Sequence, residues 1–295
     1  MLLEYIEPVF RPPSEAISPI LQVTNGCSWN NCTFCDMYTE PQKKFRPKTL
    51  QDIEQELQLI EKSGQRYRRI FLADGDAMSL SFKRLHGIMS LINKYLPDTQ
   101  RVSSYCLPRN LLNKTEDELF QLQTMGLTLM YVGCETGDDL LLEKVRKGET
   151  FESSLAALTK IKNARMKSSV MILNGLGGTT YSQQHAVNSA RLMNAAQPDY
   201  LATLVVTFYH GEQRFQKAFD GEFHALKPTE LFAEMKTLLQ HLELDKTIFR
   251  SDHASNYLIL KGILGRDKER LLLQVQNAIN DQSSANLREE WQRSL

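Results

Sequence analysis

The stretch TNGCSWNNCTFCDMY, residues 24–38, places Cys27, Cys32 and Cys35 in one short segment and supplies no fourth cysteine. A structural zinc site normally has four protein ligands, and a disulfide uses cysteines in pairs. The segment directly follows ILQVT (20–24), an apolar and β-branched run that predicts a buried strand. We therefore expect thiolate chemistry on a loop at the carboxyl end of the first strand.

Outward from this loop, β-rich runs alternate with amphipathic helical stretches. The expected strands cover residues 20–24, 69–74, 101–106, 128–134, 168–174 and 200–208. Between the first two strands, apolar residues recur at helical spacing after Thr49, an N-cap candidate, and stop at Gly64. A capping box over Thr115 to Glu118 opens another helix. Six strands that are each followed by a helix predict parallel βαβ units in an α/β protein.

The repeat length suits barrel-type units, so we predict a partial (β/α)6 TIM-like barrel that is two units short of closure. The sequence does not reveal the strand order, and a doubly wound sheet therefore remains the alternative fold. Beyond about residue 212 the alternation lapses. We predict a core barrel with an N-terminal lead-in over residues 1–212, and a small, mainly helical C-terminal extension over 213–295 that caps the barrel.

The composition narrows the class of protein. The 295 residues are 42% hydrophobic, enough for a real core, and 35 basic residues balance 35 acidic ones. A chain without net charge has no overall field for capturing nucleic acid. This sequence shows no signal-peptide layout and no apolar run long enough to span a bilayer. Five cysteines, three of them in one loop, favour thiolates in a reducing compartment over disulfides. We expect a soluble, cytoplasmic protein without a membrane partner.

Three thiolates can hold three irons of a 4Fe-4S cluster and leave the fourth iron open to a small molecule. In this respect the loop resembles that of the radical S-adenosylmethionine (radical SAM) superfamily, whose three cysteines follow the first strand of a partial (β/α)6 barrel. Cys32 and Cys35 have the family's spacing of two residues, with the aromatic Phe34 directly before the last cysteine. The metal ligands that the resemblance implies are Cys27, Cys32 and Cys35, and Phe34 is implied to lie at the cofactor.

The first spacing departs from the family pattern. Four residues, Ser28 to Asn31, separate Cys27 from Cys32, whereas the common family spacing is three. A loop absorbs one extra residue more easily than a helix or a strand does. Two alternatives stay open at this point: a zinc knuckle completed by a distant His or Asp, and a loop that binds no metal.

The resemblance also implies cofactor-binding residues after the second strand. Relatives typically carry Gly-Gly-Glu there to hold the methionine amino group of S-adenosylmethionine (SAM), and this chain has Asp74-Gly75-Asp76. The glycine keeps close backbone approach possible, and an acid suits an ammonium group. The alternative is an ordinary solvated turn.

Further positions follow from the same resemblance. Glu135, after the fourth strand, stands where relatives contact the ribose or methionine part of SAM, and Lys147 stands where some relatives bind the methionine carboxylate. Alternatively, Lys147 belongs to an exposed helix end. Ser104 on the third strand is a candidate hydrogen-bond partner of the cofactor or substrate. The turn NGLGG (174–178) resembles the family's approach to adenine, although a plain turn also explains its glycines.

The implied cofactors are the 4Fe-4S cluster and SAM. The resemblance implies that the reduced cluster cleaves SAM to a 5′-deoxyadenosyl radical, which abstracts hydrogen from an unidentified small-molecule or peptide substrate. The electron donor would be a flavodoxin or ferredoxin. No catalytic side chain is assigned from the sequence, and Cys106 and Cys134 are expected to be small buried hydrophobes.

Two other functions remain open. A non-catalytic iron–sulfur or zinc-binding protein could carry the same loop. An RNA-modifying radical SAM enzyme would need a local basic footprint, for which residues 43–48 and 66–69 are candidates. Because the chain as a whole carries no net charge, nucleic acid is not the partner that we expect.

Overall fold

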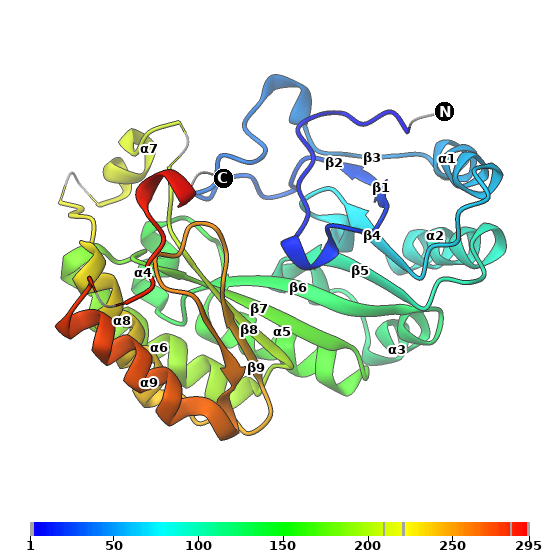
Figure 1. Ribbon diagram of the computed structural model, residues 1–295. Coiled ribbons are helices and arrows are strands. Elements are labelled where there is room, and N and C mark those ends of the chain that lie inside the picture. The colour runs from blue at the N-terminus through cyan, green and yellow to red at the C-terminus, as the bar shows by residue number, and fades with distance from the viewer. Residues whose placement is uncertain (1–2, 209, 220–221, 284, 294–295) are drawn as a thin grey trace. The chain divides into compact units, whose positions relative to one another are not determined.

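A computed structural model describes residues 3–208, 210–219, 222–283 and 285–293 (Figure 1). The strands are β1 (Ile20–Gln22), β2 (Thr24–Asn25), β3 (Arg46–Pro47), β4 (Arg69–Ala73), β5 (Arg101–Cys106), β6 (Leu127–Glu135), β7 (Lys167–Asn174), β8 (Tyr200–Val205), β9 (Ile248–Ser251) and β10 (Leu260–Ile263). The α-helices are α1 (Leu50–Lys62), α2 (Phe82–Tyr95), α3 (Glu116–Thr124), α4 (Asp139–Lys144), α5 (Phe151–Asn163), α6 (Gly178–Ala196), α7 (Gln213–Gln216), α8 (Pro228–His241) and α9 (Leu264–Asn280). Strands and helices alternate along the chain, which confirms the α/β class.

Within the described ranges, one mostly parallel eight-stranded sheet contains the strands that the sequence predicted. Its order is β1-β4-β5-β6-β7-β8-β9-β10. The strands β1, β4, β5 and β6 pair in parallel, as do β7, β8 and β9. The order follows the chain without the reversal that defines a doubly wound sheet. The barrel-type arrangement is therefore confirmed, and the doubly wound alternative is wrong.

The C-terminal part of the chain extends the sheet. The sequence predicts a possible strand and loop over residues 247–260, but not that this segment pairs with the sheet. β9 pairs in parallel with β8, and β10 pairs antiparallel with β9. β8 itself ends at Val205 and not at residue 208, and there the Val205 N–H donates to the side chains of Ser255 and Asn256, each at 3.1 Å. The predicted extension thus contains strands as well as helices.

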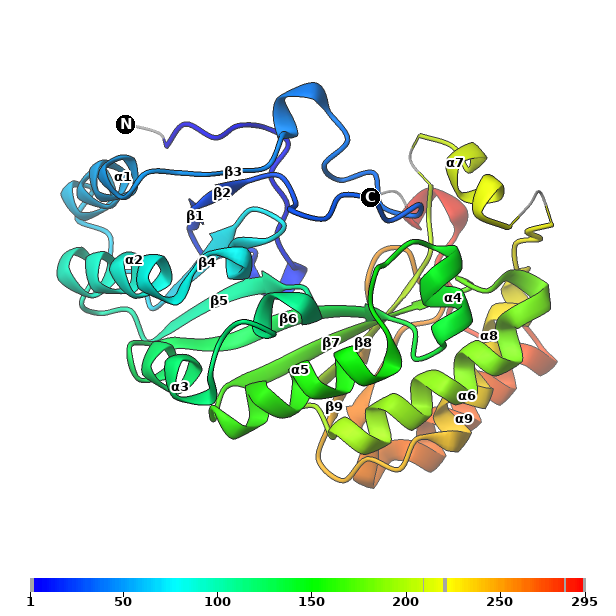
Figure 2. The same ribbon diagram turned by 180° about the vertical axis from the view of Figure 1, so that it is seen from behind.

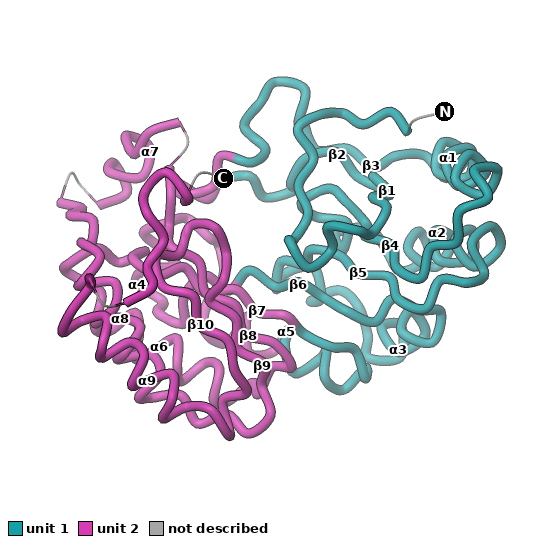
Figure 3. The backbone as a smooth tube through the Cα atoms, in the orientation of Figure 1, with its two compact units in different colours: residues 1–30, 37–133, 157–168 teal, residues 31–36, 134–156, 169–295 magenta. Residues whose placement is uncertain are grey.

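The chain forms two compact units (Figure 3). Unit 1 contains residues 1–30, 37–133 and 157–168, and unit 2 contains residues 31–36, 134–156 and 169–295. In unit 1, α1 packs on α2 and α2 packs on α3; in unit 2, α6, α8 and α9 lie side by side (Figure 2). Residues 213–295 share unit 2 with β8. The predicted domain boundary at residue 212 stays a prediction.

Local sequence signals set the helix ends. The Thr49 side chain accepts the N–H of Asp52 at the start of α1, and Gly64 follows the helix with a φ of 71°. At α3, Thr115 and Glu118 form the predicted capping box. In the part of the chain that the structure describes, none of the helices is both long and apolar enough for a bilayer crossing.

Candidate functional site

The cysteine loop belongs to two units of the structure. Cys27 lies in unit 1, whereas Cys32 and Cys35 lie in unit 2. Cys32 is buried, and the other two cysteines are half-buried. Among the described residues, no three His, Cys, Asp or Glu side chains are grouped as ligands of one metal ion. The convergence of the three thiolates on one cluster therefore stays a prediction.

Two segments of unit 2 anchor the loop around Cys32 and Cys35. The Thr33 N–H donates to the carbonyl of Val145, directly after α4, at 3.0 Å. From α7, the guanidinium of Arg214 donates to the carbonyl oxygens of Cys32 at 2.6 Å and Cys35 at 3.3 Å. These bonds fix the backbone at both predicted ligands. Sequence reasoning missed Arg214, because it lies where the strand and helix alternation lapses.

Phe34 packs against an apolar cluster of unit 2. The buried members of this cluster are Leu141, Val145, Leu176, Phe215, Phe219 and Phe223. Phe34 also neighbours Lys147, whose Nζ atom lies 5.7 Å from the centre of the Phe34 ring. The aromatic side chain between the last two cysteines thus anchors the loop in the core of the unit. Its predicted contact with a cofactor stays a prediction.

Glu135 and Lys147, two predicted cofactor-binding residues, meet in a buried ion pair. Lys147 Nζ donates to Glu135 Oε1 at 2.8 Å, and the two residues are 4% and 7% exposed. Burial by itself would lower the pKa of Lys147, but attraction to Glu135 and to the nearby Cys32 and Cys35 raises this pKa above its ordinary value. The exposed-helix-end alternative for Lys147 is therefore wrong.

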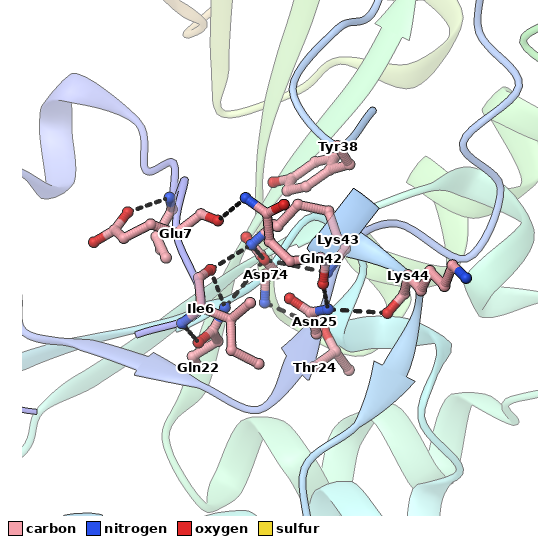
Figure 4. A network of polar contacts seen from close by, with 12 residues as sticks. Ile6, Glu7, Gln22, Thr24, Asn25, Tyr38, Gln42, Lys43, Lys44 and Asp74 are labelled. Atoms are coloured by element: carbon pink, nitrogen blue, oxygen red, sulfur yellow. Dashed lines mark hydrogen bonds and ion pairs between the residues drawn. The ribbon is translucent and has the colours of Figure 1, made fainter. Parts of the chain in front are cut away.

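In unit 1, Asp74 is fully buried at the end of β4 (Figure 4). Its Oδ2 atom accepts hydrogen bonds from the ammonium of Lys43, from the side chain of Gln22 at 3.2 Å and from the N–H of Gly26 at 3.2 Å. Lys43 is equally buried and also donates to the carbonyl of Ile6 at 2.8 Å. Burial raises the pKa of Asp74, and the Lys43 ammonium opposes that rise.

This arrangement excludes a solvated turn at Asp74-Gly75-Asp76. It also corrects the interpretation of Lys43 as part of a basic surface run, because the side chain is inside the protein. No sequence signal indicates this burial, since the neighbouring residues have no regular apolar spacing. Asp74 has its charged partner within unit 1, so we interpret it as an anchor of the loop start at Gly26; its contact with SAM stays a prediction.

Asp76 is the second buried acid of this segment. Its Oδ2 atom accepts hydrogen bonds from the hydroxyl and, at 3.3 Å, from the N–H of Ser28, the residue directly after Cys27. Its Oδ1 atom is buried without a hydrogen-bond partner among the described residues. Burial raises the pKa of Asp76, and the bonds from Ser28 oppose the rise. A buried carboxylate oxygen without a donor is a site at which an external cation can bind.

The glycine between the two acids is required by packing. A Cβ atom on Gly75 would lie 2.2 Å from the ring of Tyr38, so no larger residue fits. The group that approaches this backbone within unit 1 is therefore an aromatic side chain of the chain itself. The contact of Gly75 with the cofactor stays a prediction.

The additional residue between the first two cysteines is accommodated at Asn30. This residue adopts a φ of 43°, in the left-handed region where asparagine is among the better tolerated residues. Its side-chain amide donates to the carbonyl of Tyr38 at 2.8 Å. One residue earlier, the ring of Trp29 stacks on the guanidinium of Arg109 at 3.7 Å. The first three spacer residues, Ser28 to Asn30, thus lie in a structured turn of unit 1.

Ser104 is fully buried in β5. Its hydroxyl lies 2.9 Å from the carbonyl oxygen of Tyr105 and 3.3 Å from that of Leu72. The side chain has local backbone partners, and its predicted role at the cofactor or substrate stays a prediction. The two remaining cysteines, Cys106 and Cys134, are buried as predicted, and burial raises the pKa of Cys134 to about 12.

The glycine-rich turn after β7 is held by a residue that sequence reasoning missed. Glu234 on α8 is buried and accepts hydrogen bonds from the Gly175 N–H at 2.6 Å and from the Ser182 hydroxyl at 2.7 Å. Gly175 itself has a φ of 80°, which favours glycine. Because Glu234 follows this turn by 59 residues, no local pattern connects the two.

The sequence matches the Radical SAM superfamily over residues 21–190, which is more than half of the chain. The chain therefore belongs to the radical SAM superfamily. The matched region begins in β1, before the cysteine loop, and ends within α6.

Two proteins and one solved structure are similar to the chain. The heme chaperone HemW of Bacillus subtilis is 26% identical over 216 residues, covering 69% of this chain and 54% of HemW. A Methanocaldococcus jannaschii protein with a provisional methylthiotransferase name is 22% identical over 249 residues, covering 77% of this chain and 53% of that protein. The structure of coproporphyrinogen III oxidase (HemN) from Escherichia coli, a radical SAM enzyme, aligns with a TM-score of 0.55 at 16% identity, covering 76% of this chain and 50% of HemN. The chain spans about half the length of the curated relatives that it matches.

The residues present fit the cofactors that the family binds. Cys27, Cys32 and Cys35 supply three thiolate donors, the number that leaves one iron of a 4Fe-4S cluster open. Asp76 supplies a buried carboxylate oxygen that lacks a donor among the described residues. Lys147 supplies a buried cation in unit 2, close to Cys32 and Cys35. Soft sulfur ligands, an acid and a cation are the donor types that a cluster and an amino acid require.

Proposed function

We propose that this protein is a radical SAM enzyme that acts on a small-molecule or peptide substrate. When bound and reduced by one electron, the cluster and SAM together supply a 5′-deoxyadenosyl radical that abstracts a hydrogen atom. Cys27, Cys32 and Cys35 bind the cluster. The observation that carries the proposal is the three-cysteine loop of a radical SAM family member, with the buried Asp76 bonded to Ser28 beside Cys27.

The other residues of the site bind and orient SAM. The carboxylate of Asp76 binds the ammonium of the methionine part, because its Oδ1 atom has no donor among the described residues. Lys147 binds the methionine carboxylate, and Glu135 holds the lysine side chain in place. Arg214 holds the backbone at Cys32 and Cys35, so that the two thiolates keep their spacing.

Replacing Asp76 with alanine is expected to weaken SAM binding about 10- to 100-fold, the loss expected for a charge-assisted hydrogen bond of roughly 1.5–3 kcal/mol. Isothermal titration of the anaerobically reconstituted protein with SAM measures this change. The iron content should stay at the wild-type level. Asp98→Ala, at an exposed acid of unit 1, serves as the control and should leave both quantities unchanged. Iron loss in Asp76→Ala would assign the acid to the cluster and not to SAM.

The proposed function is tested by SAM cleavage. The protein is reconstituted with iron and sulfide without oxygen, mixed with SAM and dithionite, and assayed for 5′-deoxyadenosine. We expect product from the wild type and none from Cys35→Ala. A loop that retains zinc after anaerobic purification, or an intact 4Fe-4S cluster that never cleaves SAM even in the presence of candidate substrates, would contradict the proposal.

A second candidate is a non-catalytic cofactor carrier, which the similarity to the heme chaperone HemW favours. This function predicts saturable heme binding, visible as a shifted Soret band, without cleavage of SAM. The RNA-modifying alternative needs basic side chains at the surface, and two of its candidates already have acidic partners: Lys43 is buried against Asp74, and Lys48 is paired with Glu56. It still predicts RNA binding that weakens steeply with salt.

A further inference from the structure

Unit 2 carries a hollow of about 350 Å³, which we call the cationic hollow. It is lined by Leu140, Glu143, Lys144, Arg146, Lys217 and Ala218. Three of these residues are basic and one is acidic, so the lining is positive in a chain whose formal net charge is zero. Arg146 and Lys217 are exposed, and Lys144 is half-buried, with its ammonium 5.6 Å from the ring centre of Phe219.

The two segments that form the cationic hollow are the same two that hold the cysteine loop. Val145, whose carbonyl accepts the Thr33 N–H, lies between Lys144 and Arg146 in the chain. Arg214, which bonds the carbonyls of Cys32 and Cys35, precedes Lys217 by less than one helical turn. Residues that line the hollow thus adjoin, in the chain, the residues that anchor the loop.

We propose that the cationic hollow is the docking surface for an acidic one-electron donor protein, a proposal that rests on the proposed function. A donor must bind close to the group that it reduces, and the basic residues of the hollow belong to the two segments whose Val145 and Arg214 bond the loop at two of the predicted ligands. Charge complementarity of this kind steers a transient partner and raises its association rate. The exposed Leu140 at the edge of the hollow supplies the apolar contact that such small interfaces also contain.

The lining favours a protein over a small anion. A site for a small anion usually converges backbone N–H groups or buried cations on one point. None of the three basic side chains here is fully buried, and Glu143 lies among them. Two exposed cations and a half-buried one, with one carboxylate among them, match the acidic surface of a protein better than a single phosphate.

The test compares a protein donor with a small one. The double variant Arg146→Glu/Lys217→Glu reverses two exposed charges, and Arg66→Glu/Arg68→Glu in unit 1 makes the same change in charge as a control. Reduction of the 4Fe-4S cluster is followed by its absorbance under anaerobic stopped-flow mixing. The donors are reduced flavodoxin and photoreduced deazaflavin.

We expect the hollow variant to be reduced by flavodoxin at least tenfold more slowly than the wild type at low salt, with a weaker dependence on salt. The control variant should keep the wild-type rate, and deazaflavin should reduce all three proteins equally. Lys217→Glu alone should give an intermediate rate, which guards against a folding defect in the double variant. Equal flavodoxin rates in the hollow and control variants would overturn the docking surface alone. A wild-type protein without a reducible cluster would overturn the proposed function as well.

Discussion

Replacing Cys35 with alanine is expected to remove essentially all of the iron from the reconstituted protein. With three thiolates the loop can ligate three irons of the cluster, and with two it leaves a second iron without protein ligation. Cys27→Ala and Cys32→Ala should have the same result. Iron and sulfide analysis of the anaerobically reconstituted variants, together with their visible absorbance, measures the loss.

Cys134→Ser provides the matched control, because this cysteine is buried in the same unit as Cys35. Its iron content per folded chain should equal that of the wild type, and the same holds for Cys106→Ser. A four-iron cluster that persists in Cys35→Ala would remove this residue from the ligand set. A parallel loss of iron in Cys134→Ser would point to general misfolding as the cause.

Lys43→Met is expected to lower the free energy of unfolding by about 3–5 kcal/mol at neutral pH. The substitution leaves the carboxylate of Asp74 buried without its cation, and the remaining donors, Gln22 and Gly26, do not neutralise it. Because burial already raises the pKa of Asp74, this acid becomes protonated more readily than an exposed one. The destabilisation should therefore shrink as the pH falls, since protonation removes the unpaired charge. Urea unfolding of the protein at several pH values measures both effects.

An exposed ion pair supplies the comparison for Lys43→Met. Lys94 pairs with Glu54 at 3.0 Å on the surface, and Lys94→Met should leave the free energy of unfolding nearly unchanged, because solvent screens an exposed pair. The double variant Lys43→Met/Asp74→Leu should recover much of the lost stability, because it removes both charges. If Lys43→Met costs no more than Lys94→Met, the buried pair is not an important contact.

The sequence predicted those features of the fold that depend on nearby residues. The start of α1 at Thr49 and the capping box at Thr115 are local, because the side chain and the N–H that it accepts lie three residues apart. The contacts at the end of β8 are not local: the Val205 N–H bonds Ser255 and Asn256, which lie about fifty residues further along. The extension of the sheet by β9 was missed for the same reason.

The candidate site likewise contains residues that local sequence patterns indicate and residues that they do not. The three cysteines and Asp76 could be proposed as site residues because the family motifs that they resemble are short and contiguous. Arg214, Lys43 and Glu234 were missed because each acts on a residue far away in the sequence. Lys43 is the clearest case, since a lysine beside prolines and polar residues is normally a surface residue. Only tertiary packing brings it to Asp74.

The pairing of β9 with β8 also determines how the chain could be shortened. A chain cut at residue 212 would end β8 as an unpaired edge strand, with a row of backbone groups open to other molecules. It would also lose Glu234, and with it the acceptor for the N–H of Gly175. Such a fragment would be prone to edge-to-edge aggregation even if the cysteine loop were intact. The residues after 212 therefore cover the β8 edge of the sheet.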